Sequence, residues 1–313
     1  MSGVLVYSER KSVALELLTF AATLGQSTAV ALLGPDAAAW VGDCFAHGAE
    51  RAYTGDAPAL AGLPCDVVSA ALAQIVEQAG ADVILIGSTL RGREVAGRLA
   101  QKLGAGCTTD ANGLRFEDGR IVASRYALGG NTIATQVIRS DRQVVAVMPQ
   151  TVEAAPTGAG SGELVPVALT LSPSPVKITE RRAKEAGSVD VESAEVLVCV
   201  GRGVDRPEDL AMVEALAGAL GGVVGCTRPI SHDRHWLSES QMVGISGKSS
   251  SARLYVGVGV SGQIQHAVGI MGARVTVAIN KDRSAPVFKV ADYGIVGDLY
   301  EVVPKLTERL KGR

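Results

Sequence analysis

The stretch from residue 243 to residue 266, VGISGKSSSARLYVGVGVSGQIQH, decides the fold of the second half of the chain. Its centre, LYVGV at 254–258, is an apolar run of strand length. The glycine–serine turn GVSG follows at 259–262, and residues 261–269 are predicted as a helix. A strand, a glycine turn and a helix in this order predict an open α/β sheet. The turn itself is typical of a nucleotide site, because unpaired N–H groups at a helix start attract phosphate.

Similar polar turns follow the other strands predicted in this half. Their residues are Arg202 after the strand at 195–200, Thr227 and Arg228 after 222–226, Ser261 and Gly262 after 254–258, and Asn280 after 274–279. Ligands of open α/β sheets bind outside the carboxyl ends of the strands, so we expect these side chains to share one crevice. Arg202 or Lys248 is expected to supply the countercharge for a pyrophosphate.

Strand and helix patterns alternate in both halves, which predicts an α/β fold with two doubly wound domains, residues 1–185 and 186–313. The linker is expected between about 170 and 192, where apolar periodicity is weakest. In the first half, short strands at 109–114, 120–127, 132–139 and 143–147 predict an antiparallel extension of the sheet. A further short strand is predicted at 287–289.

Bulk properties exclude several classes of function. With 30 basic and 32 acidic residues the net charge is -2, so there is no electrostatic case for a nucleic-acid partner. The apolar runs have strand length, no signal-peptide pattern opens the chain, and we expect a cytoplasmic protein that does not span a membrane. Five scattered cysteines without a CxxC pair favour buried thiols over disulfides. His232 and His235 lie in a polar loop without a third ligand, so no metal site is expected.

The chain resembles the alpha subunit of electron transfer flavoproteins along nearly its whole length. In the second half the matching motifs are VGRGV at 200–204, TRP at 227–229, QMVGISGK at 241–248, LYVGVGVSGQIQH at 254–266, AINKD at 278–282 and VADYGIVGDL at 290–299. In the first half they are ADVILIGST at 81–89, GREVAGRLAQKLG at 92–104 and RYALGGNTIA at 125–134. The resemblance implies that FAD binds mainly to the second, Rossmann-like domain.

The resemblance also implies a role for each matched position. Arg202 takes the pyrophosphate side, and Thr227 and Arg228 take a Ser-Arg position, with Arg228 against the isoalloxazine. The other matched positions are Val243, Gly244, Ile245 and Ser246 at the flavin N5 edge, Ser261, Gly262, Gln263, Ile264, Gln265 and His266 along the pyrophosphate, ribityl chain and pyrimidine edge, and Asn280, Asp298 and Leu299 at the adenosine end. Ile245 and Ser246 depart from the Gln-Thr of many members, and Thr227 replaces the commoner serine.

Two of these side chains are expected to tune the flavin. Negative charge develops on the N1–C2 edge of a flavin that accepts an electron, where His266 would donate a hydrogen bond and Arg228 would add positive charge. One such bond to a charged group contributes about 1.5–3 kcal/mol, or roughly 65–130 mV. The alternatives are a core histidine whose ring is satisfied by backbone and an arginine in a surface salt bridge. Trp236 is expected at the flavin mouth or at a subunit interface.

The function implied is that of an electron carrier with no substrate of its own. Its partner would be a beta subunit that binds AMP, its donors flavin dehydrogenases such as the acyl-CoA dehydrogenases of fatty acid β-oxidation, and its acceptor a quinone-linked oxidoreductase or another protein. The first domain would contact the partner subunit without a complete nucleotide site, so the RGRE run at 91–94 is expected to serve packing or subunit contact rather than phosphate binding. One alternative is an electron-bifurcating member in which NADH is oxidised at a second FAD in the beta subunit. Another is a nucleotide-binding regulatory module without redox chemistry.

Overall fold

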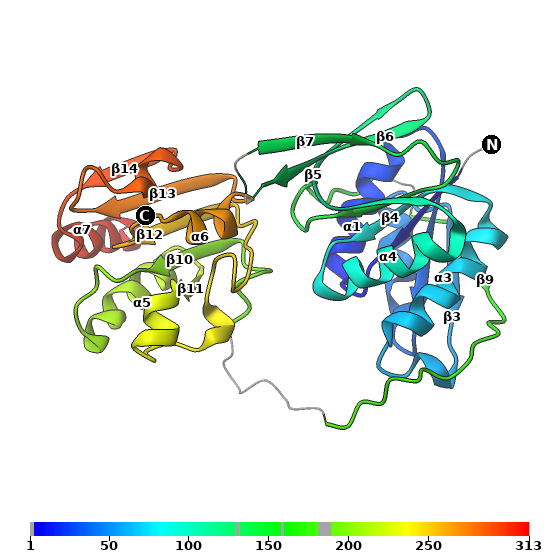
Figure 1. Cartoon of the computed structure of the whole chain (residues 1–313), viewed down its shortest axis with the longest axis horizontal. Helices are drawn as coiled ribbons and strands as arrows, with labels where there is room; N and C mark the ends of the chain where they lie inside the picture. Colours follow the sequence, from blue (N-terminus) through cyan, green and yellow to red (C-terminus); the bar gives the residue numbers. More distant parts are fainter. Residues whose placement is uncertain (1–2, 129, 131, 158–159, 181–188, 313) are drawn as a thin grey trace. The chain divides into compact units, whose positions relative to one another are not determined.

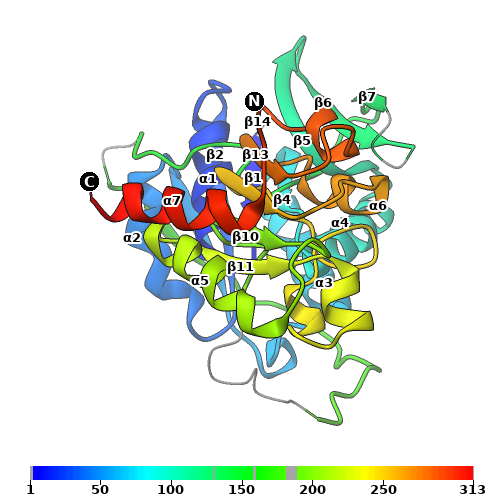
Figure 2. The same cartoon turned by 90° about the vertical axis from the view of Figure 1, so that its left-hand side faces the viewer.

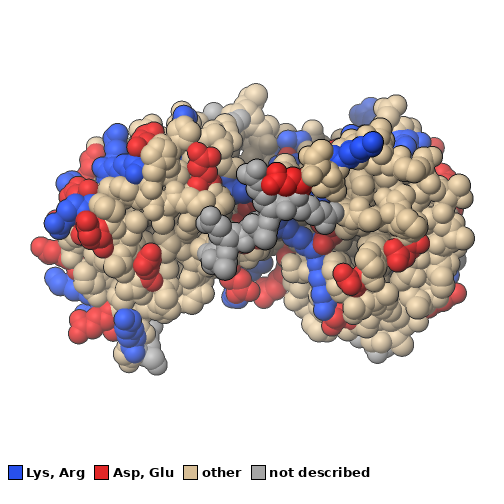
Figure 3. Space-filling model, turned by 90° about the horizontal axis from the view of Figure 1, so that it is seen from below, with Lys and Arg blue, Asp and Glu red and all other residues tan. Residues whose placement is uncertain are grey.

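The computed structural model describes residues 3–128, 130, 132–157, 160–180 and 189–312 (Figure 1). The chain forms two compact units, Met1–Arg181 and Arg182–Arg313. The domain boundary expected at residues 185 and 186 lies outside the described residues. No helix in the described part of the chain is both long and apolar enough to cross a membrane. Acidic and basic side chains are interspersed on the face shown in Figure 3.

The first unit is built on a sheet of nine described strands in the order β7-β6-β5-β8-β4-β1-β2-β3-β9. The strands are β1 Gly3–Tyr7, β2 Ser27–Leu33, β3 Arg51–Gly55, β4 Ala81–Gly87, β5 Gly106–Glu117, β6 Arg120–Ala127, β7 Thr132–Val137, β8 Gln143–Val147 and β9 Glu163–Pro166. The helices are α1 Lys11–Ala22, α2 Val41–Ala46, α3 Cys65–Ala79 and α4 Leu90–Leu103, with 3-10 turns at Ala37–Trp40 and Pro58–Leu60. Successive strand residues point to opposite faces of the sheet, so each face forms its own hydrophobic core. Helices α3 and α4 pack on one face, and α1 and α2 pack on the other.

Two details of this sheet differ from the prediction. Strands β5, β6 and β7 form the expected antiparallel section, but β8 pairs in parallel with both β4 and β5. All five residues of β8 are buried, which suits an inner strand covered on both faces. Strand β3 was not predicted, because RAYTG has too short an apolar run to stand out.

The second unit contains a parallel five-stranded sheet in the order β11-β10-β12-β13-β14. Its strands are β10 Val196–Val200, β11 Val223–Cys226, β12 Leu254–Val258, β13 Val275–Asn280 and β14 Tyr293–Val296. Its helices are α5 Leu210–Ala219, α6 Ile264–Ala267 and α7 Leu299–Lys311. Helices α5 and α7 pack together on one face, as Figure 2 shows, while Val191, Val243, Ala252 and Ile270 pack on the other. The predicted fold class, α/β with doubly wound sheets, is therefore confirmed.

Two predicted elements of this unit take another form. The strand expected at 287–289 is a 3-10 helix, Pro286–Lys289, because a proline at the first helical position sets the helical backbone angle. The helix expected at 261–269 shrinks to α6 and a 3-10 turn, Val268–Ile270, since Gly262 adopts a φ of +75°. The polar turn after β12 is correspondingly longer.

The strand order places a switch point between β10 and β12. From β10 the chain moves outward to β11, then returns across β10 to add β12, β13 and β14 on the other side. Connections on the two sides of β10 therefore leave the sheet in opposite directions. A crevice opens at such a point, at the carboxyl ends of the strands.

Candidate functional site

A cavity of about 840 Å³ lies at the carboxyl ends of the second sheet, within the size range of ligand pockets. Loops that follow β10, β11, β12 and β13 all contribute to its wall, together with residues 242–246. Twelve of the predicted site residues line it: Arg202, Thr227, Arg228, Val243, Gly244, Ile245, Ser246, Ser261, Gln263, Gln265, His266 and Asn280. The cavity belongs entirely to the second unit.

The other four predicted residues lie elsewhere. Asp298 and Leu299 line a neighbouring cavity of about 100 Å³, which shares Asn280 with the large one. Gly262 lines neither cavity: a Cβ there would lie 2.3 Å from the backbone of Val287, so the residue serves the turn. Ile264, also outside both linings, begins α6 with its side chain 49% exposed.

Several lining residues were not predicted as ligand contacts. They lie in the loops that follow β10, β11, β12 and β13 or directly before Val243: Gly203, Asp205, Pro229, Met242, Gly259, Val260, Lys281, Asp282, Ala285 and Pro286. For Gly203, Pro229, Met242, Val260 and Lys281, a predicted residue next in the chain was the available signal. Lys281, for example, adds a third cation next to Asn280.

Glycine backbones meet at the switch point. Gly201 donates its N–H to the Val258 carbonyl (2.9 Å) and Gly203 donates to the Gly259 carbonyl (3.0 Å). A Cβ on Gly201 would lie 2.4 Å from the Gly259 oxygen, and Gly259 has a φ of +62°. The loops after β10 and β12 therefore touch by their main chains, which leaves the backbone open to close approach by a ligand.

The charged groups around the cavity favour an anion. Arg202, Arg228 and Lys281 line it, and none of these three has an ion pair among the described residues. Of the two acidic residues, Asp282 accepts hydrogen bonds from the N–H (2.9 Å) and hydroxyl (2.6 Å) of Ser284, which lower the pKa of its carboxyl. Three cations thus face two carboxylates, one of which is already engaged.

Turn amides add neutral donors. In the described part of the chain, the backbone N–H groups of Gly262 and Gln263 donate no hydrogen bond, while the Ser261 carbonyl accepts from Val287. The helix that follows has only four residues, so its dipole contributes less than the predicted longer helix would have done. Unpaired amides and an arginine on a facing loop are donors that suit a pyrophosphate.

The loop Val243–Ser246 forms an apolar part of the wall. Ile245 donates its N–H to the Gln265 carbonyl (2.7 Å), and Gly244 donates to the Lys248 carbonyl (3.0 Å). Gly244 has a φ of +145°, and a Cβ there would lie 2.6 Å from the Gln265 oxygen. The Ile245 side chain is 63% exposed and lines the cavity, so it presents an apolar surface suited to a flat ring.

His266 lines the cavity, but both of its ring nitrogens bond to the chain itself. Nδ1 lies 2.9 Å from the Val243 carbonyl, which can only accept, and Nε2 lies 2.7 Å from the Tyr255 hydroxyl. Burial lowers the pKa of the imidazole, so the neutral ring donates from Nδ1 and accepts at Nε2. The structure therefore matches the alternative of a core histidine whose donor is satisfied by backbone, and N–H donation from His266 to a flavin stays a prediction.

Two further expectations are corrected by packing. Lys248 is ion-paired with Glu192 at 3.4 Å and does not line the cavity, so it is not placed as countercharge. Trp236 packs against the hydrophobic core that includes residues of α5, away from the cavity lining, so its placement at the flavin mouth is corrected while the subunit interface stays a prediction. The guanidinium of Arg234 lies 4.5 Å above its ring and donates to the Val204 carbonyl at 2.7 Å. The segment 229–240 after β11 is thus tied to the loop after β10.

His232 and His235 are the two histidines considered as metal ligands from the sequence. Within the described ranges, no group of three His, Cys, Asp or Glu side chains is arranged to hold a metal ion. The Nδ1 atom of His232 lies 3.0 Å from a carboxylate oxygen of Glu239 within the segment 229–240.

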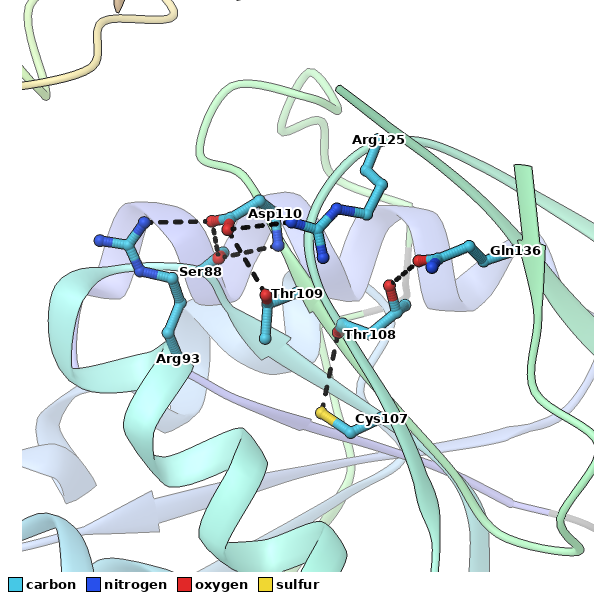
Figure 4. Close-up of polar contacts among 8 residues, drawn as sticks. All are labelled: Ser88, Arg93, Cys107, Thr108, Thr109, Asp110, Arg125 and Gln136. Atoms are coloured by element: carbon cyan, nitrogen blue, oxygen red, sulfur yellow. Dashed lines mark hydrogen bonds and ion pairs between the residues drawn. The ribbon is translucent and has the colours of Figure 1, made fainter. Parts of the chain in front are cut away.

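In the first unit, the arginines that begin α4 are engaged locally. Arg93 pairs with Asp110 at 3.2 Å, and Ser88 donates to the same carboxylate at 2.8 Å (Figure 4). Asp110 has a φ of +57° at an irregularity in β5, and Arg125 of β6 lies 3.9 Å from its other oxygen. Arg91 donates to the Gly62 carbonyl at 3.0 Å. These contacts tie β4, α4 and the antiparallel section together, which favours the packing role expected for residues 91–94.

Comparisons with known proteins agree with this geometry. Residues 4–172 match the electron transfer flavoprotein domain and residues 190–271 the electron transfer flavoprotein FAD-binding domain. The "Putative electron transfer flavoprotein subunit YdiR" of Escherichia coli K12 is 40% identical over 73% of each chain. Protein FixB of Salmonella typhimurium LT2 is 33% identical over 99% of this chain and 98% of its own length. Protein FixB of Escherichia coli O1:K1 is 36% identical over 76% of this chain and 77% of its own.

The first family match alone spans more than half of the chain, and the match to FixB of Salmonella typhimurium covers 99% of it. The second match includes β10, β11 and β12 and the loops that meet at the switch point. The volume of the cavity, its unpaired cations and its backbone donors fit FAD. This chain belongs to the electron transfer flavoprotein family as an alpha-type, FixB-like member with an FAD-binding C-terminal domain.

Proposed function

We propose that this chain is the alpha subunit of a heterodimer that takes electrons from a flavin dehydrogenase, such as an acyl-CoA dehydrogenase, and passes them to a quinone-linked oxidoreductase or another acceptor. The proposal rests on the cavity at the β10–β12 switch point. Among the described residues, this cavity combines cations without ion pairs, backbone N–H groups without acceptors and glycines that bring the backbone of two loops together. FAD, when bound, supplies the electron-accepting ring. The chain supplies binding and electrostatics.

The wall suggests a division of roles along the cavity. Arg202 and the amides of Gly262 and Gln263 would hold the pyrophosphate. Arg228, exposed and without an ion pair among the described residues, would place positive charge beside the isoalloxazine. Ile245 would pack against that ring.

Asn280 acts differently from a simple ligand contact. Its amide nitrogen donates to the Val260 carbonyl (2.8 Å), and its oxygen accepts from the N–H of Asp282 (2.9 Å). The side chain therefore joins the loops after β12 and β13. We assign the adenosine end to the smaller cavity beside it, which Asp298 and Leu299 line.

The lining also supports a carrier rather than an enzyme with its own substrate. His266 has both ring nitrogens bonded within the chain, and three of the five charged side chains of the described lining are cations that attract an anionic ligand. These groups bind and orient. The first unit would provide contacts for the beta subunit.

The test is to co-express the chain with its beta subunit, quantify the released flavin and AMP, and titrate the complex with NADH. One FAD and one AMP per heterodimer, with no bleaching by NADH, would support the simple carrier. Two FAD and bleaching by NADH would identify the bifurcating alternative. A colourless complex that FAD cannot reconstitute would overturn the proposal and favour a regulatory nucleotide-binding module.

An Arg228→Gln variant tests the electrostatic part. We expect FAD to remain bound while its midpoint potential falls by roughly 65–130 mV, the equivalent of one bond to a charged group. Arg253→Gln is the matched control, because Arg253 is exposed and lies outside the cavity lining. Equal potentials in the two variants would remove Arg228 from this role.

A further inference from the structure

We propose that Tyr255 is a positioning residue of the FAD site: its hydroxyl anchors the imidazole of His266 at Nε2, and the imidazole in turn holds the Val243–Ser246 loop against the cavity through Nδ1–H. The inference rests on the proposed function, because the loop matters only if the cavity binds FAD. It assigns a role to a side chain that does not itself line the cavity.

The hydroxyl of Tyr255 is set in an apolar environment. Tyr255 lies on β12 and is 0% exposed, among Val191, Leu197, Ala252 and Ile270. The thiol of Cys199 is a polar neighbour of the phenol, and the Nε2 atom of His266 lies 2.7 Å from its oxygen. A phenylalanine would fill nearly the same volume without burying a polar atom. The hydroxyl therefore contributes hydrogen bonding rather than packing.

The Val243 carbonyl decides which atom donates in each of the two hydrogen bonds of His266. A carbonyl has no proton, so Val243 must accept from Nδ1–H of His266. Burial keeps the ring neutral, which leaves Nε2 with a lone pair and makes Tyr255 its donor. In the opposite tautomer the Nδ1 lone pair would face the lone pairs of the Val243 carbonyl. The Val243 carbonyl thus sets the tautomer, and the Tyr255 hydroxyl is the donor that anchors the ring at its other nitrogen.

The loop is connected to this relay on both sides. Val243 donates its N–H to the Cys226 carbonyl (2.9 Å) and accepts from the imidazole through its own carbonyl. Two residues later, Ile245 donates to the carbonyl of Gln265, the neighbour of His266 in the chain. Ring and loop therefore move together, and Ile245 and Ser246 face the cavity from this loop.

The first test reads the tautomer directly and needs no flavin. Two-bond 1H–15N correlations of the ¹⁵N-labelled full chain distinguish Nδ1–H from Nε2–H imidazoles. The chain has four histidines, so a His266→Gln spectrum assigns the signal. We expect the Nδ1–H form in the wild type. An Nε2–H or charged ring at neutral pH would overturn the proposal, even if the tyrosine variant fails to fold.

The second test compares Tyr255→Phe with Tyr293→Phe in the heterodimer. Tyr293 is 66% exposed on β14 and has no hydrogen bond from its hydroxyl among the described residues, so it is the matched control. We expect Tyr255→Phe to keep the Nδ1–H tautomer, to shift the ¹⁵N signal of Nε2, which loses its donor, to shift the flavin midpoint potential and to weaken FAD binding roughly 2- to 13-fold, as for one neutral hydrogen bond. The control should change none of these.

The outcomes separate this inference from the proposed function. An unchanged Nε2 signal, potential and FAD affinity in Tyr255→Phe would overturn the positioning role while the flavoprotein function stands. A changed Nε2 signal with an unchanged potential and affinity would likewise overturn it, because a merely structural bond would behave in this way. A wild-type heterodimer that binds no FAD would overturn the proposed function. The tautomer measurement on the wild-type chain needs no FAD, so its result would not change.

Discussion

A methyl group added at Gly201 tests the glycine contact at the switch point. The new Cβ of Gly201→Ala would lie 2.4 Å from the Gly259 oxygen and 2.6 Å from the Val260 Cα. Ordinary contact begins at 3.4 Å, so the loop after β12 must retreat by about 1 Å. The atoms in the way are backbone, which cannot turn aside as a flexible side chain can. Gly201 itself does not line the cavity.

The cost follows from this overlap. Overpacking of a tight contact costs about 1–3 kcal/mol of unfolding free energy. The same retreat lengthens the hydrogen bonds from Gly201 to Val258 and from Gly203 to Gly259, each worth about 1 kcal/mol. It also moves the donors expected at the pyrophosphate. We therefore expect FAD affinity to fall about tenfold or more, since 1.4 kcal/mol corresponds to a factor of ten.

Urea unfolding and fluorescence titration with FAD measure both effects. The chain has two tryptophans, so a Trp40→Phe background leaves Trp236 as the reporter of the second unit. Gly218→Ala is the matched control, because a Cβ there meets nothing within 4 Å and helix α5 should gain up to about 1 kcal/mol. If Gly201→Ala unfolds and binds FAD like this control, the close-approach argument is wrong.

Three further predictions concern charge, packing and protonation. Arg202→Gln should weaken FAD binding roughly 10- to 150-fold, because Arg202 lines the cavity. Lys248→Gln should change FAD binding less than about twofold, because the Lys248 ammonium is ion-paired outside the cavity. Equal losses in the two variants would contradict the placement of both residues. Trp236→Ala should destabilise the second unit by about 2–4 kcal/mol in urea unfolding followed by circular dichroism, with the Arg234 stacking a minor part, and a loss under about 1 kcal/mol would contradict its core packing. Burial lowers the pKa of His266 in the folded state, so the unfolded chain takes up a proton first as the pH falls below about 6.5. The free energy of unfolding should therefore drop by up to about 1.4 kcal/mol per pH unit below that pH, and His266 should not affect it at higher pH. The same pH series on His266→Gln should lack this slope.

Local patterns explain why much of the architecture was predictable. The run LYVGV followed by GVSG predicted β12 and its turn, since an apolar run of strand length and a glycine turn are both local features. Strand β8 illustrates the limit: its sequence predicts a strand but not its partners, and it returns to the parallel part of the sheet. Pro286 turned an expected strand into a 3-10 helix.

For the candidate site, the sequence determined which residues follow each strand, and parallel pairing then brought twelve of the sixteen predicted residues into one cavity. Tertiary structure alone decided what each side chain does there. The ammonium of Lys248 pairs with Glu192, the ring of Trp236 packs against the core, and both ring nitrogens of His266 bond to residues distant in sequence. A residue's place along the chain follows from local backbone preferences, whereas its hydrogen-bond and charge partners depend on which distant segments the packed sheet brings within about 3 Å.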